Sequence, residues 1–108
     1  MINKIAFVDI GELGWSLYLS AHIRWLKKNS DSMIAVIGFP DRRCLYADLA
    51  DEIVNAPDIF YEKYNLNMQD SYKLRKVGWS ELKTFFSPYA PKGYRITDHK
   101  RNRNRSLI

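Results

Sequence analysis

Residues 4–39 read KIAFVDIGELGWSLYLSAHIRWLKKNSDSMIAVIGF, and this stretch decides the fold class of the chain. Its two ends, KIAFV at 4–8 and MIAVIGF at 33–39, are apolar without alternation and rich in β-branched side chains. Such runs are typical of strands that are covered on both faces, as in a parallel sheet. Because the residues between them follow a helical period, the stretch predicts a βαβ unit with a right-handed crossover.

The helix expected between the two strands is amphipathic. One face carries apolar side chains, namely Trp15, Leu19, Ile23 and Leu26. The other face carries polar ones at helical spacing, namely Ser16, Ser20, Arg24, Lys27 and Lys28. The turn-forming run KNSDS at 28–32 ends the helix before the second strand.

The pattern continues beyond the second strand. A second, shorter helix is expected over residues 41–50, with Asp41 as its N-cap and with Leu45 and Leu49 facing inward. Residues 53–54 are expected to form a brief third strand. Two βα repeats and a third strand predict an α/β fold: a three-layer, mostly parallel, Rossmann-like half-sheet in a single domain.

The expected domain covers residues 1–96 and has two parts. The βαβ core occupies residues 3–56, and an aromatic-rich part of helices and loops occupies 57–96, where nine of the 15 aromatic residues lie. A helix is expected over 79–86, with Ser80 as its candidate cap, followed by a loop. A three-stranded sheet is narrow, so the aromatic part is expected to expose an apolar patch and to support a homodimer.

Composition points to an ordinary globular protein. Of the 108 residues, 46% are apolar and 27% are charged, which argues against a disordered or fibrous chain. The single cysteine, Cys44, cannot form an internal disulfide, and no closely spaced histidine pair suggests a metal site. No apolar run is long enough to span a membrane. These features favour a cytoplasmic protein with no metal and no cofactor.

The net charge of +5 is confined to the end of the chain. Lysines and arginines balance aspartates and glutamates, 11 against 11, over residues 1–91, whereas residues 92–108 hold six basic and one acidic residue. The basic tail, 97–108, is therefore expected to be disordered or a truncated connection. A nucleic-acid or acidic-membrane contact through this tail is the alternative, and the neutral body does not favour nucleic acid as a partner.

The loop after the first strand is the first candidate for a site. Gly11 and Gly14 allow close approach of a ligand to the backbone, and the amides of residues 12–16 lie at a helix N-terminus. The spacing G-x-x-G is neither a dinucleotide fingerprint nor a P-loop, and Glu12 would repel a phosphate. Glu12 is better suited to act as a general base or to grip hydroxyl groups. The alternative is that it only offsets the helix dipole.

Other chemical groups lie near the same edge of the predicted sheet. Arg42 and Arg43 follow the second strand and could bind a carboxylate or a phosphate, unless they are simply solvated. Asp9, at the end of the first strand, is expected to hydrogen-bond the following turn. The alternative is an edge carboxylate for metal binding or phosphoryl transfer, but the D-x-D motif and a second acidic cluster are absent from the sequence. Cys44 has no recognisable base to make it a nucleophile, and His22 is expected to lie within a helix without binding a ligand.

Two segments together resemble a known family. The ordered sets GELGW at 11–15 and LYADLAD at 45–51 are similar to the amino-terminal Rossmann-like half of GT-B glycosyltransferases, closest to bacterial and viral heptosyltransferase-type sequences. The resemblance covers about residues 3–60. It implies that this half holds the sugar or glycan acceptor, and that Glu12 is the candidate catalytic base. Gly11, Gly14, Trp15, Arg42 and Arg43 are the candidate substrate-binding residues. Trp15 and Tyr46 are expected to pack within the protein in preference to stacking on a sugar.

The resemblance has a consequence for activity. In this family a second domain, with glycine-rich and acidic motifs, holds the nucleotide-sugar donor, and 108 residues do not supply it. The chain is therefore expected to be the acceptor-side domain of a glycosyltransferase-like protein, incomplete as an enzyme, with a nucleotide-sugar partner only where a second domain exists. The alternatives are a stand-alone α/β interaction module and a small nucleic-acid-binding protein that acts through its basic tail.

Overall fold

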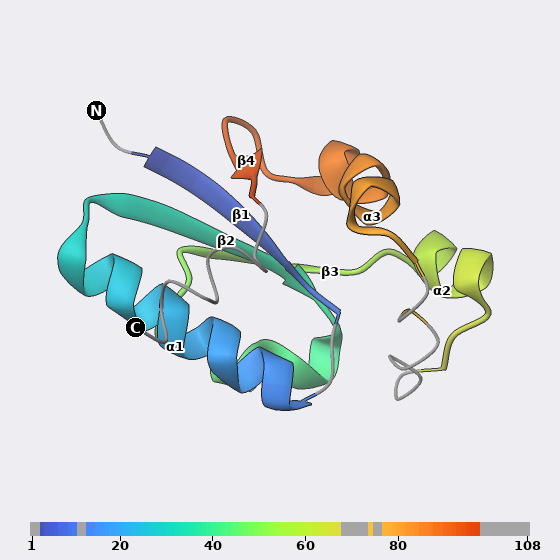
Figure 1. The fold of residues 1–108 in the computed structure, drawn as a ribbon, viewed down its shortest axis with the longest axis horizontal. Coiled ribbons are helices and arrows are strands. Elements are labelled where there is room, and N and C mark those ends of the chain that lie inside the picture. Colours follow the sequence, from blue (N-terminus) through green and yellow to red (C-terminus); the bar gives the residue numbers. More distant parts are fainter. Residues whose placement is uncertain (1–2, 11–12, 68–73, 75–76, 98–108) are drawn as a thin grey trace.

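A parallel sheet with helices on both faces forms the centre of the molecule (Figure 1). The computed structural model describes residues 3–10, 13–67, 74 and 77–97. Within them the sheet has four strands: β1 (Asn3–Asp9), β2 (Ser32–Gly38), β3 (Glu52–Asn55) and β4 (Arg95–Ile96). Their order is β3-β2-β1-β4, and all three pairings are parallel. The predicted α/β, Rossmann-like fold class is confirmed.

The βαβ unit predicted from residues 4–39 is present. Helix α1 (Leu13–Asn29) connects β1 to β2, which pair in register from Asn3 opposite Ser32 to Asp9 opposite Gly38. Both strands therefore end at the same level. Lys27 and Lys28 lie in the last turn of α1, where basic side chains interact favourably with the helix dipole.

One face of the sheet is covered by α1 and by the 3₁₀ helix η1 (Pro40–Leu45). Its buried core consists of Phe7, Leu19, Ile23, Ile34, Val36 and Tyr46. The prediction of an Asp41-capped helix over 41–50 is wrong in detail, because Phe39 is the N-cap and Asp41 lies inside the first turn. Pro40 at the start fixes the backbone for a helical turn, and only a short 3₁₀ helix follows. Leu45 and Leu49 are half-buried against the core, as predicted.

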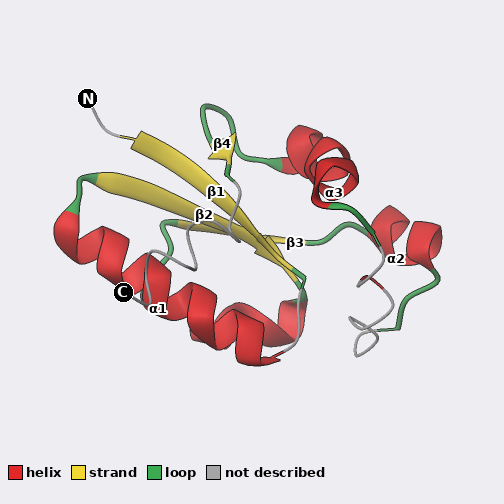
Figure 2. Ribbon diagram, in the orientation of Figure 1, coloured by secondary structure: helices red, strands yellow, loops and turns green. Residues whose placement is uncertain are grey.

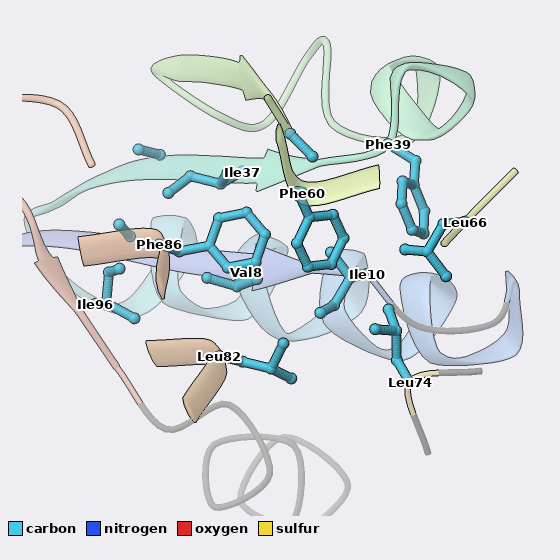
Figure 3. Packing of buried hydrophobic residues seen from close by; sticks show 13 residues of the cluster. Val8, Ile10, Ile37, Phe39, Phe60, Leu66, Leu74, Leu82, Phe86 and Ile96 are labelled. Carbon is cyan, nitrogen blue, oxygen red and sulfur yellow. The ribbon is translucent and has the colours of Figure 1, made fainter. Parts of the chain in front are cut away.

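The other face is covered by α2 (Asp58–Tyr64) and α3 (Trp79–Phe86), as Figure 2 shows. A 3₁₀ turn, η3 (Ser87–Tyr89), follows α3. The core on this face is larger, and its main members are drawn in Figure 3. Phe60 of α2 lies at its centre, fully buried, next to Phe86 with 4.8 Å between the ring centres. The aromatic residues of the second part of the chain thus pack onto the sheet.

Local backbone features explain where the later elements begin and end. Helix α2 ends at Asn65, whose φ of 53° is left-handed, a conformation that asparagine tolerates better than most residues. Gly93 has a φ of 87° in the turn that leads into β4. Helix α3 has the predicted bounds, but its N-cap is Gly78 and not Ser80, which lies within the helix.

Asp51 connects the end of α1 to the sheet. Its carboxylate accepts hydrogen bonds from Lys27 Nζ and from the backbone N–H of Ile34, each at 2.8 Å. Burial alone would raise the pKa of Asp51, but these two partners outweigh it and lower the pKa below its usual value. The second aspartate of the LYADLAD segment therefore has a structural role in this fold.

A tyrosine connects the two helices on the other face. Tyr64 of α2 donates a hydrogen bond of 2.5 Å to Glu81 of α3. Burial, followed by the bond to this carboxylate, raises the pKa of Tyr64 to about 12, so the phenol remains a donor at neutral pH.

Among the described residues, no helix combines the length and the apolar character needed to cross a membrane.

Candidate functional site

The carboxyl ends of β1 and β2 form the edge where the candidate site lies. The chain moves from β1 to β2 and β3 in one direction, and then crosses the opposite face to place β4 on the far side of β1. The strand order therefore reverses between β1 and β4. Open α/β sheets bind ligands at the carboxyl edge next to such a reversal. Asp9 is the last residue of β1, and its side chain is the first polar group at this edge.

Asp9 is buried within a small polar cluster. Its side chain is 1% exposed, and its two carboxylate oxygens accept hydrogen bonds from different elements. Ser16 Oγ of α1 donates to Oδ1 at 2.9 Å, and the Tyr46 hydroxyl donates to Oδ2 at 2.5 Å. The same hydroxyl lies 3.2 Å from the Ser16 carbonyl oxygen. Strand β1, helix α1 and the turn after η1 are thus joined at one carboxylate.

The environment of Tyr46 keeps its hydroxyl protonated. Burial first, and then the negative charge of Asp9, raise the pKa of Tyr46 far above its ordinary value. A phenol in this position acts as a hydrogen-bond donor throughout the physiological pH range. Its bond to Oδ2 holds the Asp9 carboxylate in place.

Arg42 connects the buried cluster to the molecular surface. Its Nη1 donates a hydrogen bond of 2.7 Å to Ser16 Oγ, which in turn donates to Asp9. Its Nε lies 3.6 Å from the Asp41 carboxylate, and its side chain is 14% exposed. Asp9, Ser16 and Arg42 therefore form one chain of hydrogen bonds from the strand end to a guanidinium at the edge of the sheet. The positive charge of Arg42 stabilises the buried carboxylate through Ser16.

The ends of β1 and β2 pack closely against each other at this edge of the sheet. A Cβ atom added at Gly38 would lie 2.4 Å from the backbone oxygen of Asp9, closer than any real contact of this kind. At Gly14, in the first turn of α1, an added Cβ would meet no atom within 4 Å. Gly38 is therefore required for the packing of the site, whereas Gly14 is not.

This difference between the two glycines leads to a test. We expect Gly38→Ala to lower the free energy of unfolding by about 1–3 kcal/mol, because the backbone of β1 must shift to admit the methyl group. Gly14→Ala is the matched control, and it should change stability by less than about 1 kcal/mol, in the stabilising direction, because alanine favours the helix. Urea unfolding followed by circular dichroism measures both. Equal effects of the two substitutions would contradict the close contact.

The structure brings together some of the predicted site residues and separates others. Gly11 and Glu12, the candidate base, lie outside the described residues. Gly14 is exposed at the start of α1, and Trp15 is half-buried beside it. The two predicted arginines diverge: Arg42 contacts Ser16, whereas Arg43 Nη1 donates to Asn55 Oδ1 at 3.1 Å, at the end of β3.

Ser16 and Tyr46 are the site residues that sequence reasoning missed. Ser16 was expected on the outer, polar face of α1, but it is fully buried. That expectation is wrong because a serine with two partners inside the protein does not need water. The sequence feature that indicates this burial is the position of Ser16 in the first helical turn after a strand that ends in an aspartate. The buried position of Tyr46 agrees with the preference for a packed role over stacking on a sugar.

A shallow pocket lies beside this cluster, under η1. It is lined by Val36, Gly38, Phe39, Arg42, Arg43, Tyr46 and Ile53, and it holds about 170 Å³ of empty space, part of it open to solvent. Its enclosed part is far smaller than the roughly 300–1,000 Å³ of pockets that enclose a small-molecule ligand. A ligand at this edge would therefore be bound on an open surface.

Over the described residues, no three His, Cys, Asp or Glu side chains group in a way that could hold a metal ion.

Comparison with known proteins does not assign a family to the chain. No family model, no curated protein and no solved structure matches it. The similarity of residues 3–60 to a glycosyltransferase half therefore stays a prediction, and function has to be argued from the site itself.

Proposed function

We propose that this chain is the acceptor-side domain of a glycosyltransferase-like protein, with its ligand bound at the carboxyl edge of β1. The observation that supports the proposal is the chain of hydrogen bonds from Asp9 through Ser16 to Arg42. This chain fixes a guanidinium at the position where open α/β sheets bind ligands. A fixed guanidinium can donate to the hydroxyl groups of a sugar or to an acidic substituent on it.

The proposed roles of the site residues follow from their chemistry. Arg42 would hold the acceptor, while Asp9, Ser16 and Tyr46 would keep its guanidinium in place. Glu12, which the resemblance nominates, would accept the proton of the acceptor hydroxyl as that oxygen attacks the anomeric carbon of a donor. The nucleotide-sugar donor would be held by a second domain, so these 108 residues alone are expected to bind acceptors and not to turn over donors.

Binding to the isolated chain tests this function. Backbone amide spectra of ¹⁵N-labelled protein would be recorded during titrations with a neutral disaccharide, a hexose 6-phosphate and a nucleotide-sugar. We expect saturable shifts of the Gly14, Ser16 and Arg42 amides with one of the first two probes, at millimolar affinity, because the surface is open. The nucleotide-sugar should bind more weakly than that probe.

Two arginine variants provide the control. Arg42→Ala should weaken the binding at least fivefold, whereas Arg95→Ala, which removes an exposed arginine of β4, should leave it unchanged. The proposal would be contradicted by equal effects of the two variants, or by the absence of saturable shifts with every sugar probe. Tighter binding of the nucleotide-sugar than of the other probes would also contradict it.

A further inference from the structure

The hydroxyl of Tyr61 is a buried polar group that the site described above does not use. Tyr61 belongs to α2, in the aromatic part of the chain, whose described aromatic side chains pack against the core instead of exposing the expected apolar patch. The residue as a whole is half-buried, but its hydroxyl oxygen is shielded from solvent and has no hydrogen-bond partner among the residues that the structure describes. Because buried hydroxyl groups are normally hydrogen-bonded, this one is able to bind a further group.

Tyr61 lies at the carboxyl edge of the sheet. Its ring centre is 5.8 Å from that of Phe39, which follows β2 and is the N-cap of η1. Burial first, and then the negative charges of Asp41 and Asp58, raise the pKa of Tyr61. The phenol is therefore protonated at neutral pH and can donate a hydrogen bond.

A second tyrosine has a buried hydroxyl but lies at the other end of the strands. Tyr94 shares with Tyr61 a shielded oxygen that has no hydrogen-bond partner within the described part of the chain. It directly precedes β4 and lies beside Lys4 at the amino end of β1, with 5.8 Å between Lys4 Nζ and its ring centre. Open α/β sheets bind ligands at the carboxyl edge, so Tyr61 is the one of the two that is placed to contact a ligand.

Asp41 connects Tyr61 to the proposed site. Its Oδ2 lies 3.6 Å from Nε of Arg42, and its charge is close enough to Tyr61 to act on the phenol. The side chain of Asp41 is 40% exposed, so a ligand can reach its oxygens. This part of the edge therefore combines two donors, the guanidinium and the phenol, with a carboxylate that accepts.

We propose that Tyr61 is a further ligand-binding residue at this edge and that it recognises an oxygen of an uncharged sugar. The inference rests on the proposed function, because it takes the carboxyl edge as the acceptor site. Each sugar hydroxyl both donates and accepts, so neighbouring hydroxyls match a set of donors and acceptors. A phosphate or carboxylate would match the guanidinium, but Asp41 and Asp58 would repel it from the Tyr61 end of the site.

A change of the Tyr61 rotamer brings the hydroxyl to the ligand. The oxygen is covered in this structure, whereas the residue as a whole is partly exposed. Exposed side chains change rotamer within picoseconds to nanoseconds. The covered position leaves the hydroxyl unpaired, which is unfavourable, so the movement exchanges an unpaired group for a hydrogen-bonded one.

Sugar binding by two tyrosine variants tests the proposal. ¹⁵N-labelled protein would be titrated with a neutral disaccharide and with the same disaccharide carrying a 6-phosphate. The unchanged protein should bind the neutral form more tightly. Tyr61→Phe should weaken that binding at least fivefold, whereas Tyr94→Phe, which removes a buried hydroxyl at the amino end, should leave it unchanged. Equal effects of the two variants, or tighter binding of the phosphorylated form, would overturn the proposal.

Urea unfolding separates a role in binding from a role in folding. Tyr61→Phe should unfold at the same urea concentration as the unchanged protein or at a higher one, because phenylalanine has the same shape and leaves no unpaired hydroxyl. A lower midpoint together with unchanged sugar binding would show that the hydroxyl is bonded inside the folded protein, for instance to an internal water, and would contradict the proposal.

Arg42→Ala distinguishes failure of this inference from failure of the proposed function. If Arg42→Ala weakens sugar binding and Tyr61→Phe does not, the edge binds sugars without Tyr61, and only the inference fails. If Tyr61→Phe alone weakens it, the inference holds and the role proposed for Arg42 fails. If no sugar shifts any amide of the unchanged protein, both fail.

Discussion

Replacement of Asp9 by alanine is expected to lower the free energy of unfolding by about 3 kcal/mol, because it removes the carboxylate through which α1 and the turn after η1 are hydrogen-bonded to β1. Ser16 and Tyr46 would keep their hydroxyl groups inside the protein without the carboxylate that now accepts from both. The guanidinium of Arg42 would lose the negative charge that it stabilises through Ser16. The melting temperature should fall by about 10–20 °C for a domain of this size.

A double-mutant cycle separates the Tyr46 contribution from the rest. Tyr46→Phe removes only the hydroxyl and should cost about 1–2 kcal/mol. The double variant with Asp9→Ala should be less destabilised than the sum of the two by about 1 kcal/mol, because the same bond is removed in both. Asp9→Asn, which keeps the shape and loses the charge, should fall between wild type and Asp9→Ala. Additive effects would mean that the short contact between Asp9 and Tyr46 contributes nothing to stability.

If Asp9→Ala left the free energy of unfolding unchanged or raised it, the result would indicate a role of Asp9 in ligand binding. Groups that are maintained for ligand binding often reduce stability, and their removal can stabilise a protein. If Asp9→Ala were stabilising while Arg42 lost its sugar-dependent spectral shifts, Asp9 would be maintained for binding and not for folding. The stability and binding measurements together therefore distinguish the two roles.

The predictable part of the fold is the part with long periodic patterns. Strands β1 and β2 each have seven residues, and α1 has 17, so their patterns repeat often enough to identify them. Strand β4 has two residues and α2 has seven, which leaves too little pattern to detect. Both depend on tertiary contacts: β4 pairs with the middle of β1, and α2 is held by burial of Phe60.

The candidate site was only partly predictable for a related reason. Sequence reasoning could place Asp9 and Arg42 at one edge of the sheet, because both follow strands that end there. It could not connect them through Ser16, since the hydrogen bonds join residues that are seven and 26 positions apart. A polarity pattern assigns a serine to the solvent face, and only the folded structure shows the partners that make its burial favourable.

Replacement of Phe60 by alanine is expected to be the most destabilising change in the core, at about 3–5 kcal/mol. The side chain is fully buried, and its ring centre lies 4.8–6.4 Å from the centres of five other rings, those of Phe39, Tyr61, Tyr64, Phe85 and Phe86. These rings come from η1's N-cap, α2 and α3, so their ability to close together over a cavity is limited. The loss would be a large fraction of the roughly 5–15 kcal/mol that stabilises a typical domain.

Ile59→Ala is the matched control for this substitution, because Ile59 precedes Phe60 in α2 and is 53% exposed. It should change the free energy of unfolding by less than about 1 kcal/mol. Urea unfolding measures both variants, with the same slope m of the unfolding free energy against urea concentration used for each. A Phe60→Ala protein as stable as Ile59→Ala would show that α2 and α3 do not depend on the sheet for stability. The expected large difference would instead mean that the aromatic part of the chain closes the core on the α2 and α3 face of the sheet.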